Sequence, residues 1–259
     1  MKTMKVNEGE VPQYYVENSH EAIIDPTDWD IVQAEIARRK TLGRAYSGNS
    51  VFSSRLGCGD CDSFFGQKVW HSNDAYRKVI WRCNGKFKGE KKCTTPHLDI
   101  ETIQQKFLFA YNQLMENREG VISDCNQIRN LVSDCTELDA EIDKLTEEIE
   151  VLAGMVKACV KENAASAQSQ KEYTKKYNAL VKRYEKTSAR LDALAAEKSR
   201  KQDRDRELRL FIESIKKQPL VLEVWSERLW VGLIEKATVF HDGRMVFQFK
   251  NGMEIEVEL

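Results

Sequence analysis

Residues Arg55-Leu56-Gly57-Cys58-Gly59-Asp60-Cys61 place two thiols three positions apart on a short turn that contains glycine. Two further cysteines, Cys83 and Cys93, complete the spacing Cys-x2-Cys-x21-Cys-x9-Cys. Four thiolates around one ion make a closed tetrahedral site, which is structural because no coordination position is left for water. The spacing therefore predicts a zinc ribbon with one structural Zn²⁺ held by Cys58, Cys61, Cys83 and Cys93.

The three cysteines outside this quartet lie in sequence with helical periodicity; they are Cys125, Cys135 and Cys159. Disulfides among the seven are an alternative, which the odd count and the absence of a secretory signal at the start disfavour. No stretch approaches the roughly 18 apolar residues that a membrane span needs. We therefore expect an intracellular chain with no membrane partner.

The net charge of −1 conceals a basic window between Glu35 and Leu98. This window holds thirteen Lys and Arg residues and five Asp and Glu residues, so its formal charge is 13 − 5 = +8. Six aromatic residues between Phe64 and Phe87 are interleaved with the cations. Such a ribbon is typical of a surface that binds nucleic-acid phosphates. For any single residue, the alternative is that the aromatics fill the ribbon and the lysines solvate it.

The candidate DNA contacts lie on the predicted hairpin, with strands at 62–66 and 77–82, and on the loop after it, outside the metal site. They are Lys68, His71, Ser72, Arg77, Lys78, Lys86 and Lys88. We expect most of them to contact phosphates and a few to contact base edges in the major groove. Arg77 equally suits a surface salt bridge. His71 equally suits a turn cap, and the complete cysteine quartet disfavours it as a zinc ligand.

Beyond Asp99 the apolar residues follow a helical period, first on a face formed by Ile103, Phe107, Tyr111 and Leu114. Between residues 128 and 159 the apolar steps then alternate between three and four without a break, which is a heptad seam. A second, more basic seam spans residues 173–198. An acidic arm followed by a basic arm predicts an antiparallel coiled-coil hairpin of roughly 60 Å, with its tip at residues 163–169.

Leucines at every seventh position also suggest a parallel zipper preceded by a basic region that reads DNA. Between Asp99 and Asn130 there are only three basic residues against five acidic ones. Such a segment would repel a duplex, so we reject the zipper.

The two ends of the chain carry the remaining order. Pro26 at a first helical position predicts a helix to about Lys40, with an apolar stripe of Trp29, Val32 and Ile36. Near the other end, a short helix that includes Leu208 and Ile215 is expected to stop before Pro219. Three strands then follow at 237–241, 244–250 and 253–258, joined by Asp-Gly and Asn-Gly turns. Three short strands rarely stand alone, so we expect them to pack back on the ribbon.

Four segments in this order resemble the carboxy-terminal half of a large serine recombinase, the integrase type found in phages and mobile elements. The first is Ala22-Ile23-Ile24-Asp25 with Trp29, Val32, Gln33, Arg38 and Arg39, similar to the end of that family's recombinase domain. The second is the ribbon, from Arg55 through Trp81-Arg82-Cys83 to Cys93. The heptad hairpin and the closing segment that starts at Leu233-Ile234-Glu235-Lys236 complete the set.

The resemblance implies an α+β fold in which a zinc β-ribbon domain carries an inserted antiparallel coiled coil and a C-terminal β-meander packs back. It implies four regions: the end of a recombinase domain with its linker helix (1–46), the first part of the zinc domain (47–118), the coiled coil (119–202), and a helix and meander that complete the zinc domain (203–259).

The resemblance also implies a function in site-specific DNA recombination. The family cuts DNA with a serine in a resolvase-type domain, which does not match any part of this chain; Ser47, Ser50, Ser53 and Ser54 read as linker serines. We assign no catalytic residue and expect a DNA-binding fragment of an enzyme that acts in the cytoplasm of a bacterial host. The implied partners are an attachment site in duplex DNA, other recombinase subunits bound through the coiled-coil tip, and a recombination directionality factor near its base.

Two other classes fit the same residues. A zinc-ribbon transcriptional regulator would dimerise through the coiled coil without DNA. A structural adaptor braced by zinc would have no salt-dependent affinity for DNA.

Overall fold

A computed structural model describes residues 7, 11–12, 21, 23–41, 50–88, 92–165 and 169–259 of the 259-residue chain. Its elements in chain order are α1 (Pro26–Thr41), β1 (Leu56–Cys58), β2 (Phe65–Trp70), β3 (Lys78–Cys83), α2 (Ile100–Met115), α3 (Arg118–Ser133), α4 (Thr136–Ala165), α5 (Gln170–Lys216), α6 (Glu227–Leu233), β4 (Ile234–Val239), β5 (Arg244–Phe249) and β6 (Glu254–Glu258). The predicted mixed α+β class is confirmed. No helix in the described ranges is long and apolar enough to cross a membrane.

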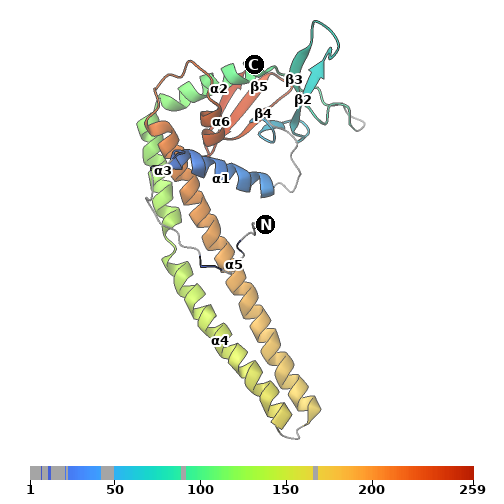
Figure 1. The fold of residues 1–259 in the computed structure, drawn as a ribbon, viewed down its shortest axis with the longest axis vertical. Coiled ribbons are helices and arrows are strands. Elements are labelled where there is room, and N and C mark those ends of the chain that lie inside the picture. Colours follow the sequence, from blue (N-terminus) through green and yellow to red (C-terminus); the bar gives the residue numbers. More distant parts are fainter. Residues whose placement is uncertain are drawn as a thin grey trace, which may run out of the picture.

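The molecule has two parts, a head and an arm (Figure 1). The head consists of both β-sheets, helices α1, α2, α3 and α6, and the C-terminal end of α5, which packs against these elements. The arm consists of α4 and the facing part of α5, which extend together away from the head. The zinc-ribbon hairpin β2–β3 projects from the head at the end far from the arm.

The head is organised around a four-stranded sheet in the order β1-β4-β5-β6. Strand β1 pairs in parallel with β4, in a register that sets Leu56 opposite Ala237. The other neighbours are antiparallel and are joined by turns at Gly243 and Gly252, whose φ angles of 90° and 97° favour glycine. The predicted three-stranded meander is therefore part of a larger sheet, because β1 from the ribbon segment supplies its first strand.

One aromatic core joins segments that are far apart in the sequence. Phe52 lies 5.7 Å from Trp81 of β3 and 5.1 Å from Trp230 of α6, measured between ring centroids. Trp230 in turn contacts Phe107 of α2 at 5.5 Å and Phe247 of β5 at 6.3 Å. Edge-to-face pairs of this kind add to the stabilisation from burial. The ribbon and the C-terminal strands therefore share a single core.

Helix α1 attaches to the head through a side other than its apolar stripe. Trp29, Val32 and Ile36 are 55%, 51% and 43% exposed, whereas Ile31 and Glu35 are buried. The reason is an ion pair that periodicity does not reveal. The Glu35 carboxylate accepts a hydrogen bond at 2.5 Å from Nη2 of Arg55, a residue that is only 1% exposed.

Glu35 is the centre of a cluster that also includes Arg38 and Arg39 of the same helix. Both donate to its carboxylate, at 2.9 Å and 2.7 Å. Burial alone would raise the pKa of Glu35, but the hydrogen bond from Arg38 and the charge of Arg55 lower that pKa to about 2. The Nη1 of Arg55 also donates to the carbonyl of Ile234. The cluster therefore fixes α1 to the start of β4.

The arm is an antiparallel pair of helices. Ion pairs link its two sides: Glu148 with Arg183 at 2.6 Å and Glu141 with Arg190 at 2.9 Å. The residue number rises on one side as it falls on the other, as an antiparallel arrangement requires. Leu152, buried between the helices, lies on the predicted seam. Whether the two helices supercoil as a coiled coil stays a prediction, and residues 166–168 of the predicted tip lie outside the described residues.

The prediction of an unbroken seam from residue 128 was wrong. Helix α3 ends at Ser133 and α4 begins at Thr136, with Asp134 in an extended conformation (φ −71°, ψ 105°). The Asp134 carboxylate accepts a hydrogen bond from the backbone N–H of Thr136 at 3.1 Å, so this side chain caps the new helix and competes with a continuous one. Leu131, predicted as a seam leucine, is 76% exposed.

The prediction of a separate short helix around Leu208 was also wrong. Helix α5 runs for 47 residues, from Gln170 to Lys216, and its last turns carry Leu208, Phe211 and Ile215 into the head core. The sequence between the two predicted helices is charged and contains neither Gly nor Pro. Because Lys, Arg, Gln and Glu are good helix formers, nothing there ends the helix.

Candidate zinc centre and nucleic-acid interface

The four predicted metal ligands lie together at one end of the sheet. One ligand atom from each of Cys58, Cys61, Cys83 and Cys93 lies within 4.8 Å of the others. The sulfurs of Cys58 and Cys93 are 3.4 Å apart, and those of Cys61 and Cys83 are 3.3 Å apart. Sulfurs bound to one Zn²⁺ at 2.3 Å lie about 3.8 Å apart in a tetrahedron, so the set fits that ion after small shifts.

The ends of strands and two glycines position these thiols. Cys58 is the last residue of β1 and Cys83 the last residue of β3. A Cβ on Gly59 would lie 2.2 Å from the Phe240 ring, and one on Gly85 would lie 3.0 Å from the Cys61 sulfur. Side chains at either position would therefore displace the walls of the site. Asp62 follows with φ 54°, and this left-handed turn is why β2 begins at Phe65 rather than at the predicted residue 62.

A buried hydroxyl supports the thiols from behind. Oγ1 of Thr95, which has no exposed surface, lies 2.9 Å from the Cys58 sulfur and 2.8 Å from the Cys93 sulfur. The hydroxyl donates to Asp60 at 3.1 Å, and the other Asp60 oxygen lies 3.0 Å from Nδ1 of His241. Outer contacts of this kind orient metal ligands. Thr95, Asp60 and His241 were missed in the sequence because the cysteine spacing identifies only the thiols, and no local pattern links these three residues to them.

Without a cation, two of the four thiols, Cys58 and Cys83, lie in an environment that disfavours the thiolate form. Burial raises the pKa of the Cys58 thiol, and it raises the pKa of Cys83 well above its usual range. A bound dication reverses this effect because it holds ligating thiols as thiolates. The donor set and its surroundings are therefore those of a closed structural zinc site, in which the metal would brace the ribbon and leave no position for substrate.

The seven predicted DNA contacts are placed on the β2–β3 hairpin and on the loop that follows β3. Lys68 lies on β2, His71 and Ser72 lie on the turn, and Arg77 precedes β3, all exposed. His71 adopts φ 52°, and its Nδ1 lies 3.9 Å from the Asp74 carboxylate, within the turn itself. Their contact with DNA stays a prediction.

Two of the predicted cations have partners inside the protein. Nζ of Lys78 forms an ion pair with Asp99 at 3.0 Å, and Nζ of Lys86 donates to the carbonyl of Thr95 at 2.9 Å. Hydrogen bonds from Thr102, together with the nearby Lys78, lower the pKa of Asp99 to about 2. Lys78 and Lys86 thus also contribute to the ribbon's own structure.

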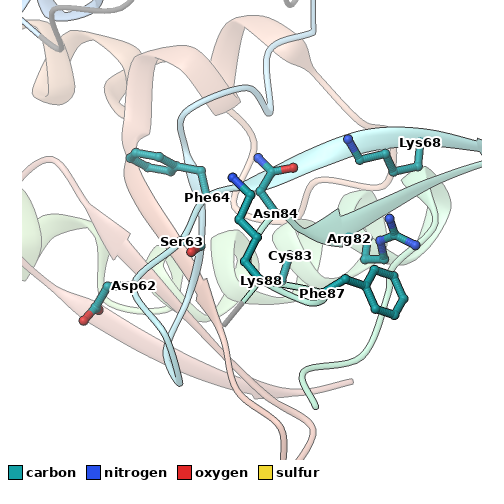
Figure 2. Close-up of a pocket in the computed structure, with 9 residues that line it drawn as sticks. All are labelled: Asp62, Ser63, Phe64, Lys68, Arg82, Cys83, Asn84, Phe87 and Lys88. Carbon is teal, nitrogen blue, oxygen red and sulfur yellow. The ribbon is translucent and has the colours of Figure 1, made fainter. Parts of the chain in front are cut away.

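A polar pocket of about 530 Å³ lies between the hairpin and the metal site (Figure 2). Its lining includes Lys68 and Lys88, and also Arg82 and Asn84, which were not among the predicted contacts. Arg82 was passed over because it is adjacent to the ligand Cys83 and was assigned to the metal site. The alternation of side chains along a strand could have identified Arg82, because Arg82 and Cys83 are consecutive in β3 and point to opposite faces of it.

Residues 51–112 match the family model described as the recombinase zinc beta ribbon domain. In this segment the chain is similar to the zinc ribbon of recombinases. The matched segment holds all four clustered cysteines, so the predicted resemblance to the recombinase family is confirmed there, and the cluster fits a structural zinc site.

No curated protein matches the chain. Among solved structures, the chain is similar to a crystal structure of an LSR–DNA complex, with 15% sequence identity and a TM-score of 0.30. The likeness covers 89% of this chain and 65% of the chain in that complex. This chain therefore spans less than two thirds of the length of that relative.

Proposed function

We propose that this chain is the DNA-binding part of a site-specific serine recombinase of the integrase type, and that its recombinase ribbon docks on one segment of an attachment site. The observation that carries the proposal is the placement of the ribbon's cations. Lys68 and Lys88 flank a pocket beside the metal site, and the structure gives neither an ion pair within its described ranges. Cations without internal partners are available to phosphates.

The recombination chemistry would lie outside this chain. No serine of the chain is assigned as a nucleophile, and the zinc site is closed. In the proposed division, residues 1–46 end a preceding recombinase domain, 47–118 and 203–259 form the zinc domain, and 119–202 form a coiled coil. The shared sheet of β1 and β4 supports the assignment of the two outer segments to one domain.

The arm would pair one recombinase subunit with another through its tip, and a directionality factor would bind near its base. Two features support a role between molecules. Helix α4 alone has 30 residues, which corresponds to about 45 Å, and the arm lies away from the head along its length (Figure 1). Altering residues 163–169 should therefore impair subunit pairing and spare DNA affinity. Equal loss of both properties would contradict this assignment.

The decisive experiment is duplex-DNA affinity at several salt concentrations, with pooled genomic fragments from which any preferred sequence is recovered. A recovered site, with binding that weakens steeply as salt rises, supports the recombinase function. Weak binding without sequence preference contradicts site recognition by this chain. Stable dimers without DNA would instead favour a zinc-ribbon regulator. Binding that does not depend on salt would favour a structural adaptor.

A further inference from the structure

The pocket beside the metal site is lined by more cationic than anionic side chains. Lys68, Arg82 and Lys88 line it, against a single carboxylate, Asp62. In Figure 2, Asp62 lies at the far side of the pocket from Arg82, with Lys88 and Asn84 between them. None of the three cations forms an ion pair with any residue that the structure describes. A concave surface with excess positive charge concentrates anions.

Arg82 is the most constrained of these cations. Its guanidinium carbon lies 4.6 Å from the centroid of the Phe87 ring, a cation–π contact that fixes the plane of the group. Its Nε is buried and has no hydrogen-bond partner among the described residues. Because Nε has almost no exposed surface, a ligand in the pocket would be bound by the terminal Nη1 and Nη2 donors of Arg82. Lys78 and Lys86, by contrast, already have partners at 3.0 Å and 2.9 Å.

The chemistry of the pocket suits a phosphate better than a base edge. A planar guanidinium offers a fork of N–H donors that matches two oxygens of one phosphate. The Asn84 amide and the Ser63 hydroxyl, which also line the pocket, offer further donors. Base edges lie inside a groove, where a protruding side chain reaches them, whereas backbone phosphates project outward and fit a concave site.

We propose that this pocket binds one backbone phosphate of the target DNA, with Arg82 as its fixed anchor and Lys68 and Lys88 as flexible flanking cations. The proposal rests on the proposed function, and it adds a residue and a ligand group to it. A phosphate fixed beside the metal site would set the orientation of the β2–β3 hairpin on the duplex. Its contribution to affinity would be the same for every base sequence.

The test measures DNA affinity against salt concentration for the wild type, Arg82→Gln, Arg82→Lys and the control Lys157→Gln, whose side chain is on the arm. Arg82→Gln should weaken binding by about ten- to a hundredfold on every sequence. It should also reduce the slope of log affinity against log salt by about 0.9. Arg82→Lys keeps the charge and loses the fork, so it should keep the slope and recover part of the affinity. Lys157→Gln should match the wild type.

Two further measurements identify the source of the phosphate and control for misfolding of the Arg82→Gln variant. Replacing one DNA phosphate at a time with a neutral methylphosphonate should reveal one position where wild-type affinity falls and Arg82→Gln loses nothing more. If inorganic phosphate binds the protein and no DNA position behaves in this way, the pocket is a free-anion site and the proposal is overturned. If Arg82→Gln loses its zinc, Lys68→Gln and Lys88→Gln replace it, and each should reduce the slope by about 0.9.

The outcomes separate this proposal from the function on which it rests. Wild-type binding that depends on salt, with the same slope in Arg82→Gln, overturns the phosphate pocket and leaves the DNA-binding function intact. Wild-type protein with no salt-dependent affinity for DNA overturns the proposed function itself.

Discussion

The head and the arm differ in how far apart along the chain their contacting residues lie. In the head, Leu56 pairs with Ala237, and Arg55 contacts the backbone of Ile234, 179 positions away. In the arm, Glu148 meets Arg183, only 35 positions away, and each helix satisfies its own backbone. Because distant pairing carries a larger loop-closure cost, the head needs strong central contacts and the arm needs only many small ones. Perturbations should therefore act very unequally on the two regions.

The largest effect should follow loss of a zinc ligand. Cys83→Ser should abolish metal binding and unfold the ribbon, because a structural zinc supplies folding free energy directly. The helices of the arm should persist, since none of their contacts depends on the metal. Zinc content, near-ultraviolet circular dichroism of the buried Trp81 and far-ultraviolet helix signal would be measured together.

Cys135→Ser is the matched control for the zinc ligand, because Cys135 lies outside the cluster, between α3 and α4. This variant should keep one zinc per chain and the native spectra. A Cys83→Ser protein that kept its metal and its native near-ultraviolet spectrum would contradict the ligand set.

Next in size, Trp230→Ala should destabilise the head by about 3–5 kcal/mol, because it leaves a cavity where Phe52, Phe107 and Phe247 converge. Denaturant unfolding, followed by the signal of the head, gives the change in free energy. Val224→Ala is the control: Val224 is 75% exposed, and its truncation should change stability by less than about 0.5 kcal/mol. Equal effects of the two substitutions would show that the shared aromatic core does not hold the head together.

The ion cluster of Glu35 should make head stability depend on pH. The folded pKa of this carboxyl is about 2, below its reference value of 4.5, so the unfolded chain takes up the proton first. The stabilisation is therefore complete above about pH 4.5 and is lost as the pH falls toward 2, with a full value of about 3 kcal/mol.

The variant Glu35→Gln should remove most of this acid dependence and lower stability at neutral pH, because Arg55 would remain buried without its counter-charge. Unfolding free energies measured at pH 7 and pH 3 for both proteins check this. A wild type and a variant with parallel pH profiles would argue that the cluster contributes nothing.

The smallest effect should come from the surface of the arm. Arg183→Gln and Arg190→Gln each remove one exposed ion pair, which is worth about 0.2–1 kcal/mol. The difference in melting temperature from the wild type should shrink as salt is added, because salt screens exposed charges. Lys157→Gln removes a cation without a described ion-pair partner and should show no such dependence. A large loss that disappears as salt is added would mean that the arm is held by these pairs rather than by its apolar seam.

The same contrast explains which features the sequence could predict. The cysteine spacing, the heptad period and the two glycine turns act over short distances, so the residues themselves predict the clustered thiols, the long helices and the final hairpins. The parallel pairing of β1 with β4 is invisible locally, because β1 is three residues long and its partner lies beyond the whole arm.

Ion pairs between residues far apart in the chain could not be predicted from the sequence either. Helix α1 presents an apolar stripe that predicts one buried face, yet a charged residue, Glu35, decides the orientation because its partner Arg55 is buried elsewhere. At the candidate DNA surface, sequence composition identified the basic ribbon. It did not distinguish Lys78, which is paired with Asp99, from Arg82, which has no such partner among the described residues. That distinction depends on three-dimensional distances alone.

Where the arm joins the head, one side of the molecule is continuous, in helix α5, and the other side is interrupted, at the break between α3 and α4. Helix α5 is continuous from residue 170 into the core at Ile215. A force on its far end would therefore reach the core of the head along one unbroken helix. On the side opposite α5, the helix is interrupted at Asp134, where the backbone is extended and exposed. A force on the far end of the arm would therefore bend the molecule at the break between α3 and α4 and not within α5. The arm would then move toward one side in preference to the other.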